Sequence, residues 1–314
     1  ISLGLVGSEM CIRDSYITDR SGEPSILLNE SDVDDASKIN RVEHRGIIEL
    51  TSDLNKSILL VRNALARAKI DGFKVMPMGA RHSMGQQSFQ EGAILLNTLP
   101  MNAMQMNGSL LKVQAGARWF QVIDFLAELG MTVEIMQSNS DFSVGGTLSV
   151  NAHGWQPGRP PLSSSVNKIS VLTVDGEIQI CSRTKNTELF RHVLGGYGLF
   201  GVILEAWIRP VPNRVLHSSS QEVPVDRFSR VWQQITEEGA ELAYGRLSVA
   251  PASFFETVWL SIYSAVGADI ANNPEPYVID GKARLSRAIF RASLGSNRGT
   301  VSYTHLTLPT IVSV

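Results

Sequence analysis

Three segments rich in glycine and small hydroxyl residues hold the side chains of this 314-residue chain that are best placed to do chemistry. They cover residues 79–85, 145–154 and 195–201, and the first reads "GARHSMG", with an Arg-His-Ser triplet inside it. Glycine allows the backbone to approach a ligand closely, and amide groups in such loops form concave sites for anions. One such loop is usually a turn, whereas three predict backbone wrapped around a large, flat ligand that carries phosphate.

These segments do not match the two commonest nucleotide-binding motifs. None fits the Rossmann fingerprint, in which G-x-G-x-x-G leads into a helix, and none has the Gly-Lys-Ser/Thr sequence of a P-loop. The sequence therefore points away from both of these folds.

The elements that position the first two segments alternate between helix and strand. Apolar residues with helical spacing predict a helix over 52–70, with Ser52 or Asp53 as its N-cap. A strand is predicted directly before the first glycine-rich segment, and a helix closed by Gly130 is predicted before the second. The predicted strands are 74–79, 92–98, 110–117 and 131–136, and the second helix is 118–130.

The rest of the chain predicts more sheet and then a second domain. The Asp-Gly pair at 175–176 marks a hairpin turn within strands over 166–181. Residues 186–213 predict a short helix, a glycine-rich break and a long strand that is buried on both faces. The Pro-Val-Pro run at 210–212 ends the first domain, and strands around an amphipathic helix over 226–238 begin another. The predicted fold class is therefore α+β.

The two ends of the chain have an unusual relation to each other. Residues 10–15 and 301–305 can be encoded by opposite strands of one DNA segment, and both resemble translated adapters from sequencing libraries. We therefore interpret 1–15 and 301–314 as adapter-derived and leave them out of the fold prediction. On this interpretation the natural chain is a fragment, any N-terminal targeting segment lies beyond it, and its location is left open with the cytoplasm favoured.

Composition excludes several classes of function. With 43% hydrophobic and 18% charged residues, the chain can bury a sizeable core. Its formal net charge of −2 gives no electrostatic footprint for nucleic acid, and no apolar run reaches the roughly 18 residues of a membrane-spanning helix. Without Cys11, Cys181 stands alone and no disulfide is predicted. No nucleic-acid partner, membrane segment or metal site is predicted.

Three ordered motifs resemble the FAD-binding domain of the vanillyl-alcohol oxidase / p-cresol methylhydroxylase (PCMH) flavoproteins. They are "GARHSMGQ", "SVGGTLSVNAHG" and "GGYGLFGVILEAWIRPVPN". The His-Gly pair at 153–154, which ends the second segment, is similar to the aldonolactone and alditol oxidase branch, while cytokinin dehydrogenases share an R-x-H-S-like loop and the V-G-G-T-L run. Substrate contacts in this family come largely from a second domain.

The resemblance implies a domain organisation and a fold. It implies an N-terminal extension over 16–41, a PCMH-type FAD-binding domain over 42–213, and the start of a truncated α+β substrate domain over 214–300. The FAD-binding domain is expected to consist of two α+β halves, about 42–100 and 101–213, with FAD between them.

The resemblance also assigns roles to single residues. Relatives with histidine at the place of His82 bond it covalently to the 8α-methyl carbon of the flavin, and a neutral imidazole nitrogen is a good nucleophile near pH 7. The alternative is a non-covalent flavin, with His82 as a hydrogen-bonding residue of the loop. The residues expected to bind FAD are Gly79, Ala80, Arg81, His82, Ser83, Met84, Gly85, Gln86, Ser138, Ser143, Gly145, Gly146, Thr147, Ser149, Val150, Asn151, His153, Gly154, Gly201, Val202 and Ile203.

His153 has an alternative role, and three further residues have roles of their own. His153 lies either near the isoalloxazine ring or in hydrogen bonds with its own backbone neighbours. Asp141 is interpreted as a loop or flavin-contact residue, because the catalytic aspartate of cytokinin dehydrogenases lies further upstream. Cys181 is expected to be a buried small hydrophobic residue, and Trp155 lies either at the substrate entrance or in an ordinary surface loop. No catalytic residue is assigned.

The expected function is that of an FAD-dependent oxidoreductase. It would remove a hydride from a hydroxylated small molecule, such as an aldonolactone or a polyol, and pass the electrons to O2 or another acceptor. The first alternative is oxidation of a cytokinin-like amine. The others are a non-catalytic flavin- or nucleotide-sugar-binding fragment and a UDP-sugar enolpyruvyl reductase, which is disfavoured because the NADPH-using branch does not normally carry the loop histidine.

Overall fold

The computed structural model describes residues 32–36, 41–137, 139–250 and 253–265, all of them within one compact unit, Asn29–Glu275. The segments interpreted as adapter-derived, 1–15 and 301–314, lie outside the described residues. Within the described ranges, none of the helices has the length and apolar character needed to cross a membrane.

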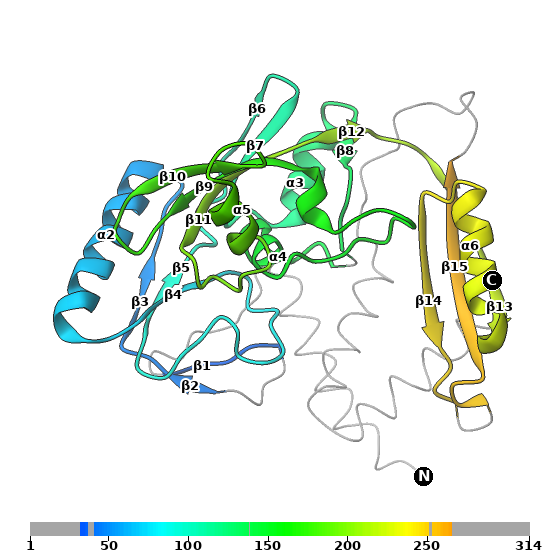
Figure 1. The fold of residues 1–314 in the computed structure, drawn as a ribbon, viewed down its shortest axis with the longest axis horizontal. Helices are drawn as coiled ribbons and strands as arrows, with labels where there is room; N and C mark the ends of the chain where they lie inside the picture. The colour runs from blue at the N-terminus through cyan, green and yellow to red at the C-terminus, as the bar shows by residue number, and fades with distance from the viewer. Residues whose placement is uncertain (1–31, 37–40, 138, 251–252, 266–314) are drawn as a thin grey trace, which may run out of the picture. The chain divides into compact units, whose positions relative to one another are not determined.

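The first part of the fold is a parallel sheet with one crossover helix. Three strands lie in the order β3-β5-β4, and both pairs are parallel. Strands β3 and β4 lie on either side of β5 in the sheet, and α2 connects the end of β3 to the start of β4 (Figure 1). The first glycine-rich segment therefore begins at the carboxyl end of β4. The elements are β3 (Gly46–Glu49), α2 (Leu54–Asp71), β4 (Val75–Met78) and β5 (Ile94–Asn97), and β1 (Asp32–Val33) pairs with β2 (Val42–Glu43).

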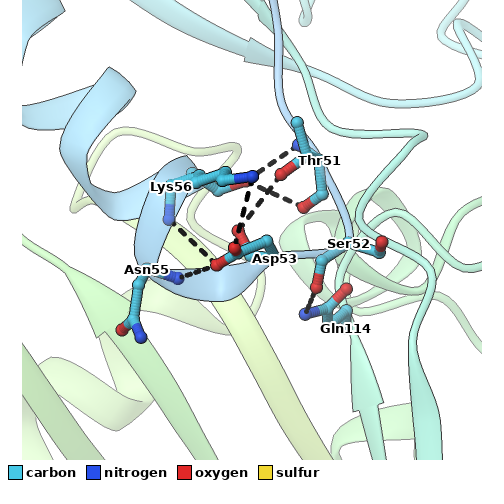
Figure 2. A network of polar contacts seen from close by, with 7 residues as sticks. Thr51, Ser52, Asp53, Asn55, Lys56 and Gln114 are labelled. Atoms are coloured by element: carbon cyan, nitrogen blue, oxygen red, sulfur yellow. Dashed lines mark hydrogen bonds and ion pairs between the residues drawn. The ribbon is translucent and has the colours of Figure 1, made fainter.

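Helix α2 has a well-formed N-terminal cap. Asp53 is the N-cap, and its Oδ1 accepts hydrogen bonds from the backbone N–H of Asn55 at 3.0 Å and of Lys56 at 3.2 Å (Figure 2). The amide of Gln114 donates to the Ser52 carbonyl oxygen at 2.9 Å, which ties the start of the helix to another strand. Of the two caps that the sequence allowed, Asp53 is the one used.

Replacing Asp53 by alanine is expected to lower the free energy of unfolding by about 1 kcal/mol, because two backbone N–H groups of the first turn lose their acceptor. Urea unfolding followed by circular dichroism measures this change. Asp53→Asn is the matched control, since an asparagine oxygen can accept the same bonds. If Asp53→Ala were as stable as Asp53→Asn, the cap would contribute nothing.

The second part is a five-stranded antiparallel sheet in the order β10-β9-β11-β7-β6 (Figure 1). Its helices α3, α4 and α5 share one hydrophobic core with strands β7, β9 and β11. The elements are β6 (Met104–Asn107), β7 (Leu110–Gln114), α3 (Trp119–Ala127), α4 (Val144–Val150), a short 3-10 helix η1 (Leu162–Ser165), β9 (Val166–Leu172), β10 (Ile178–Ser182), α5 (Thr187–Val193) and β11 (Val202–Ile208).

Strand β11 contributes side chains to the cores of both parts. It is buried along its whole length, as the sequence predicted. Ile203 and Ala206 belong to the core shared with α3, α4 and α5. Val202 and Leu204 belong to a second core, which also contains residues of α2. Neighbouring side chains on a strand point to opposite faces, so this single strand contributes to both cores.

The remaining described elements form a smaller antiparallel sheet with one helix. The strand order is β13-β15-β14, and the core contains Val223, Ile235, Ala243 and Leu260. The elements are β13 (Leu216–Pro224), α6 (Val225–Glu237), β14 (Leu242–Leu247) and β15 (Thr257–Ala265). Before them, β12 (Pro210–Pro212) pairs with β8 (Met131–Val133).

One element differs from the sequence prediction. Residues 145–154 were expected to form a loop, but Val144–Val150 is the short helix α4. Ser143 caps this helix, with its Oγ accepting a hydrogen bond from the Gly146 N–H at 3.3 Å. A β-carbon on Gly145 would lie 2.9 Å from the Ala115 β-carbon, so glycine lets the helix pack closely against the chain after β7. Composition alone suggested a loop, whereas the cap and this packing favour a helix.

Candidate functional site

The three glycine-rich segments line one cavity of about 150 Å³, as the sequence predicted. The first segment supplies one wall, α4 and the residue before it supply another, and the third segment completes it together with β11. Residues far apart in the chain therefore meet at one place. The predicted ligand-binding residues that line this cavity are Gly79, Ala80, Arg81, His82, Ser83, Ser143, Gly145, Gly146, Thr147, Ser149, Val150, Gly201 and Ile203.

Other residues expected to bind the ligand do not line the cavity. Those in the described ranges are Met84, Gly85, Gln86, Asn151, His153, Gly154 and Val202, while Ser138 lies outside the described residues. The side chain of Val202 is in a hydrophobic core. His153 is exposed, and its Nδ1 lies 3.2 Å from the Gly154 carbonyl oxygen. Of the two positions that the sequence left open for His153, the structure favours the one among its backbone neighbours.

Glycine is required where the first segment meets the residues before α4. A β-carbon on Gly79 would overlap the Ser143 hydroxyl oxygen. Two consecutive hydrogen bonds hold Ser143 in place. The indole N–H of Trp119 donates to the Thr147 hydroxyl at 2.9 Å, and this hydroxyl donates to the Ser143 carbonyl oxygen at 2.7 Å. The wall of the cavity is therefore held by a buried polar network.

Asp35 fixes the first segment, and the sequence did not single it out. Its Oδ2 accepts from the Gln86 N–H at 2.9 Å and from the Ser83 hydroxyl at 3.2 Å. Arg81 and Gln86 have backbone φ angles of 57° and 65°, a left-handed conformation that is uncommon for residues other than glycine. Because Asp35 is only 5% exposed, its contacts can hold this conformation in place. Its position within the expected N-terminal extension, 16–41, gave no signal of this role.

His82 is paired with an acidic residue at the cavity wall. Its Nε2 lies 2.8 Å from Asp141 Oδ2, and the Phe142 ring lies against the imidazole with 4.6 Å between ring centroids. Asp141 Oδ1 accepts a second bond of 2.8 Å from Arg118 Nη1. The sequence interpretation placed Asp141 in a loop or at the flavin, and the structure makes it the partner of His82. Arg118, the N-cap residue of α3, was not predicted at all.

The charges in this cluster favour an anionic ligand. Burial raises the pKa of Asp141, but its hydrogen bond with His82 and the charge of Arg118 act more strongly together and leave the pKa below its usual value. The carboxyl group is therefore ionised at neutral pH. Burial and the nearby charge of Arg118 lower the pKa of Arg81, which still starts from a value far above neutrality. Arg118 is paired with the Asp141 carboxylate, and Arg81 lies close enough to Arg118 for their charges to interact, which leaves an excess of positive charge.

The cavity combines features that suit FAD. Glycines on its wall let a ligand approach the backbone closely, and Arg81 adds a positive charge that suits a diphosphate. Val150 and Tyr197 line the cavity and are 46% and 49% exposed, respectively, so apolar surface is available for a flat ring system. His82 lies on the same wall.

Comparisons with known proteins agree with this description. A family model described as an FAD binding domain matches residues 56–182. Cytokinin dehydrogenase 2 of Arabidopsis thaliana is 34% identical over 191 residues, which cover 60% of this chain and 37% of that protein. D-arabinono-1,4-lactone oxidase of Yarrowia lipolytica is 30% identical over 123 residues, which cover 39% of this chain and 23% of that protein.

Cytokinin dehydrogenase 10 of Oryza sativa is also similar, at 35% identity over 156 residues, 46% of this chain and 28% of that protein. The alignments thus span about a quarter to somewhat over a third of these curated relatives. The matched range contains the first two glycine-rich segments, His82 and Asp141. Residues 56–182 are therefore an FAD-binding domain of the PCMH type, and FAD is its cofactor.

Proposed function

We propose that this chain is part of an FAD-dependent oxidoreductase that removes a hydride from a carbon bearing a hydroxyl group. Aldonolactones and polyols are the first substrate class, supported by the similarity to two D-arabinono-1,4-lactone oxidases and by the His-Gly pair at 153–154. The observation that carries the proposal is the cavity wall, where glycines, Arg81 and His82 meet inside the matched FAD-binding range.

The residues of the cavity would have separate tasks. Flavin supplies the acceptor for the hydride, while the protein supplies binding, orientation and local charge. Backbone N–H groups of the first segment and the Arg81 guanidinium would bind the diphosphate. Apolar contacts from Val150 and Tyr197 would hold the ring system. His82 would form a covalent bond to the 8α carbon, supported by its place on the cavity wall and its pairing with Asp141.

Oxidation of a cytokinin-like amine is the second candidate. Cytokinin dehydrogenases from two plants align with 30–35% identity. These alignments cover at most 37% of the relatives, and the family model that matches this chain describes an FAD binding domain. Cofactor-binding residues recur among enzymes with different substrates, so this similarity distinguishes the two substrate classes poorly.

The proposal is tested on the full-length protein that carries this chain. The purified protein is expected to show the absorption bands of oxidised flavin. Under anaerobic conditions, an aldonolactone or a polyol should bleach these bands, and a cytokinin-like amine should not. Bleaching by the amine alone would favour the second candidate. A protein that takes up no flavin would contradict the proposal and support a non-catalytic binding module.

A further inference from the structure

The pairing of His82 with Asp141 distinguishes the two nitrogens of the imidazole ring. A carboxylate can only accept hydrogen bonds, so in the neutral ring Nε2 carries the hydrogen and donates it to Asp141. Nδ1 then has the free lone pair. Among the described residues, no protein group hydrogen-bonds to Nδ1. The ring therefore presents one defined nucleophilic atom.

Three contacts fix the direction in which this atom points. Asp141 holds one edge of the ring, and Phe142 packs against its face. Arg118 holds the other carboxylate oxygen of Asp141, so the carboxylate has little freedom to turn away. The side chains of His82, Arg118 and Asp141 are 28%, 18% and 41% exposed, so the cluster is partly shielded from solvent. Such an arrangement orients a nucleophile before the ligand arrives.

We propose that Asp141 is the positioning residue for covalent attachment of FAD to His82, and that the bond forms through Nδ1. This inference rests on the proposed flavin linkage and adds a named partner and a named atom to it. Asp141 fixes the tautomer in which Nδ1 is unprotonated and accepts the Nε2 proton as the new bond forms. Arg118 positions Asp141.

With dioxygen as one further reactant, the atoms and electrons of the reaction balance. Nδ1 supplies the electron pair of the new bond to the 8α carbon, and this carbon gives up one hydrogen as a proton. The Nε2 hydrogen passes to Asp141 and from there to solvent. Dioxygen removes the two electrons left on the cofactor and takes up two protons. Histidine, FAD and dioxygen thus yield histidyl-FAD and hydrogen peroxide.

The test follows covalent incorporation rather than turnover. Full-length protein produced under flavin limitation is incubated with saturating FAD in air, and acid-stable flavin is measured against time. We expect Asp141→Asn to bind FAD but to form the covalent bond about 100-fold more slowly, in the range of general-base effects. Asp124→Asn, on the exposed side of α3, is the matched carboxylate control and should match the wild type.

A second variant distinguishes a chemical role of the Asp141 carboxylate from a purely structural one. In Asp141→Ala, added formate is expected to restore part of the incorporation rate, because it replaces the missing carboxylate. Formate should not change the rate of the wild type. Peptides from the wild type should carry the flavin on Nδ1, as determined by NMR of the isolated flavopeptide.

The possible outcomes distinguish the role of Asp141 from the covalent flavin linkage on which it rests. A wild-type protein whose bound FAD is fully extracted by acid refutes the covalent linkage itself, and the role of Asp141 with it. A wild type with acid-stable flavin, together with Asp141→Asn at the same incorporation rate, refutes only the role of Asp141. Linkage through Nε2 would also overturn it, because Asp141 holds that nitrogen.

Discussion

In the His82→Ala variant of the full-length protein, all FAD is expected to be released on acid precipitation, whereas the wild type stays yellow. The variant lacks the ring nitrogen that would bond to the 8α carbon, while the glycines and Arg81 that line the cavity are unchanged. We also expect kcat to fall about 10-fold, which corresponds to roughly 1.4 kcal/mol of activation free energy. The physical reason is that a histidyl substituent withdraws electron density and makes the flavin a stronger acceptor.

Two measurements check this result. Intact-mass spectrometry should show the wild type heavier by one FAD and the His82→Ala protein at its polypeptide mass. Stopped-flow reduction under anaerobic conditions measures the rate of hydride transfer. His217→Ala is the matched histidine control, because His217 is exposed on β13 and does not line the cavity. Acid-stable flavin in His82→Ala would show that another residue makes the bond.

The second large effect is expected from Gly116→Ala, two residues after the end of β7. A β-carbon at this position would overlap the Thr98 carbonyl group and lie 2.8 Å from the Met101 carbonyl oxygen. Both contacts are with backbone, which cannot move aside as a flexible side chain can. We expect a loss of about 3 kcal/mol in the free energy of unfolding, at the upper end of overpacking costs. The melting temperature should fall by roughly 6–12 °C.

The same substitution is expected to weaken FAD binding. Thr98 and Ala115 both line the cavity, and a shift of the chain around Gly116 would displace them. Thermal melts and FAD titration of the variant measure the two effects. Gly85→Ala serves as the stability control, because its β-carbon would meet only the end of the Gln87 side chain. Equal melting temperatures for Gly116→Ala and Gly85→Ala would contradict the packing argument.

The sequence by itself determined the local elements and the place of the glycine-rich segments. Helical spacing after a capping residue predicted α2 within one or two residues of its bounds, and Gly130 was correctly placed after the second helix. Apolar and polar residues alternate too loosely in β11 for a strand with one exposed face, and the strand is buried throughout. These features depend on neighbours in the chain, so periodicity and capping residues reveal them.

Only the tertiary structure decided which side chains act together. Asp35, Arg118 and Asp141 come from an N-terminal strand region, a helix start and a loop, and no spacing rule connects them to His82. The sequence identified His82 but could not show which of its nitrogens is held. Residues 144–150 read as a loop by composition, yet the cap at Ser143 and close packing on Ala115 make them helical. Such contacts form between segments that lie far apart in the sequence, so local sequence patterns cannot reveal them.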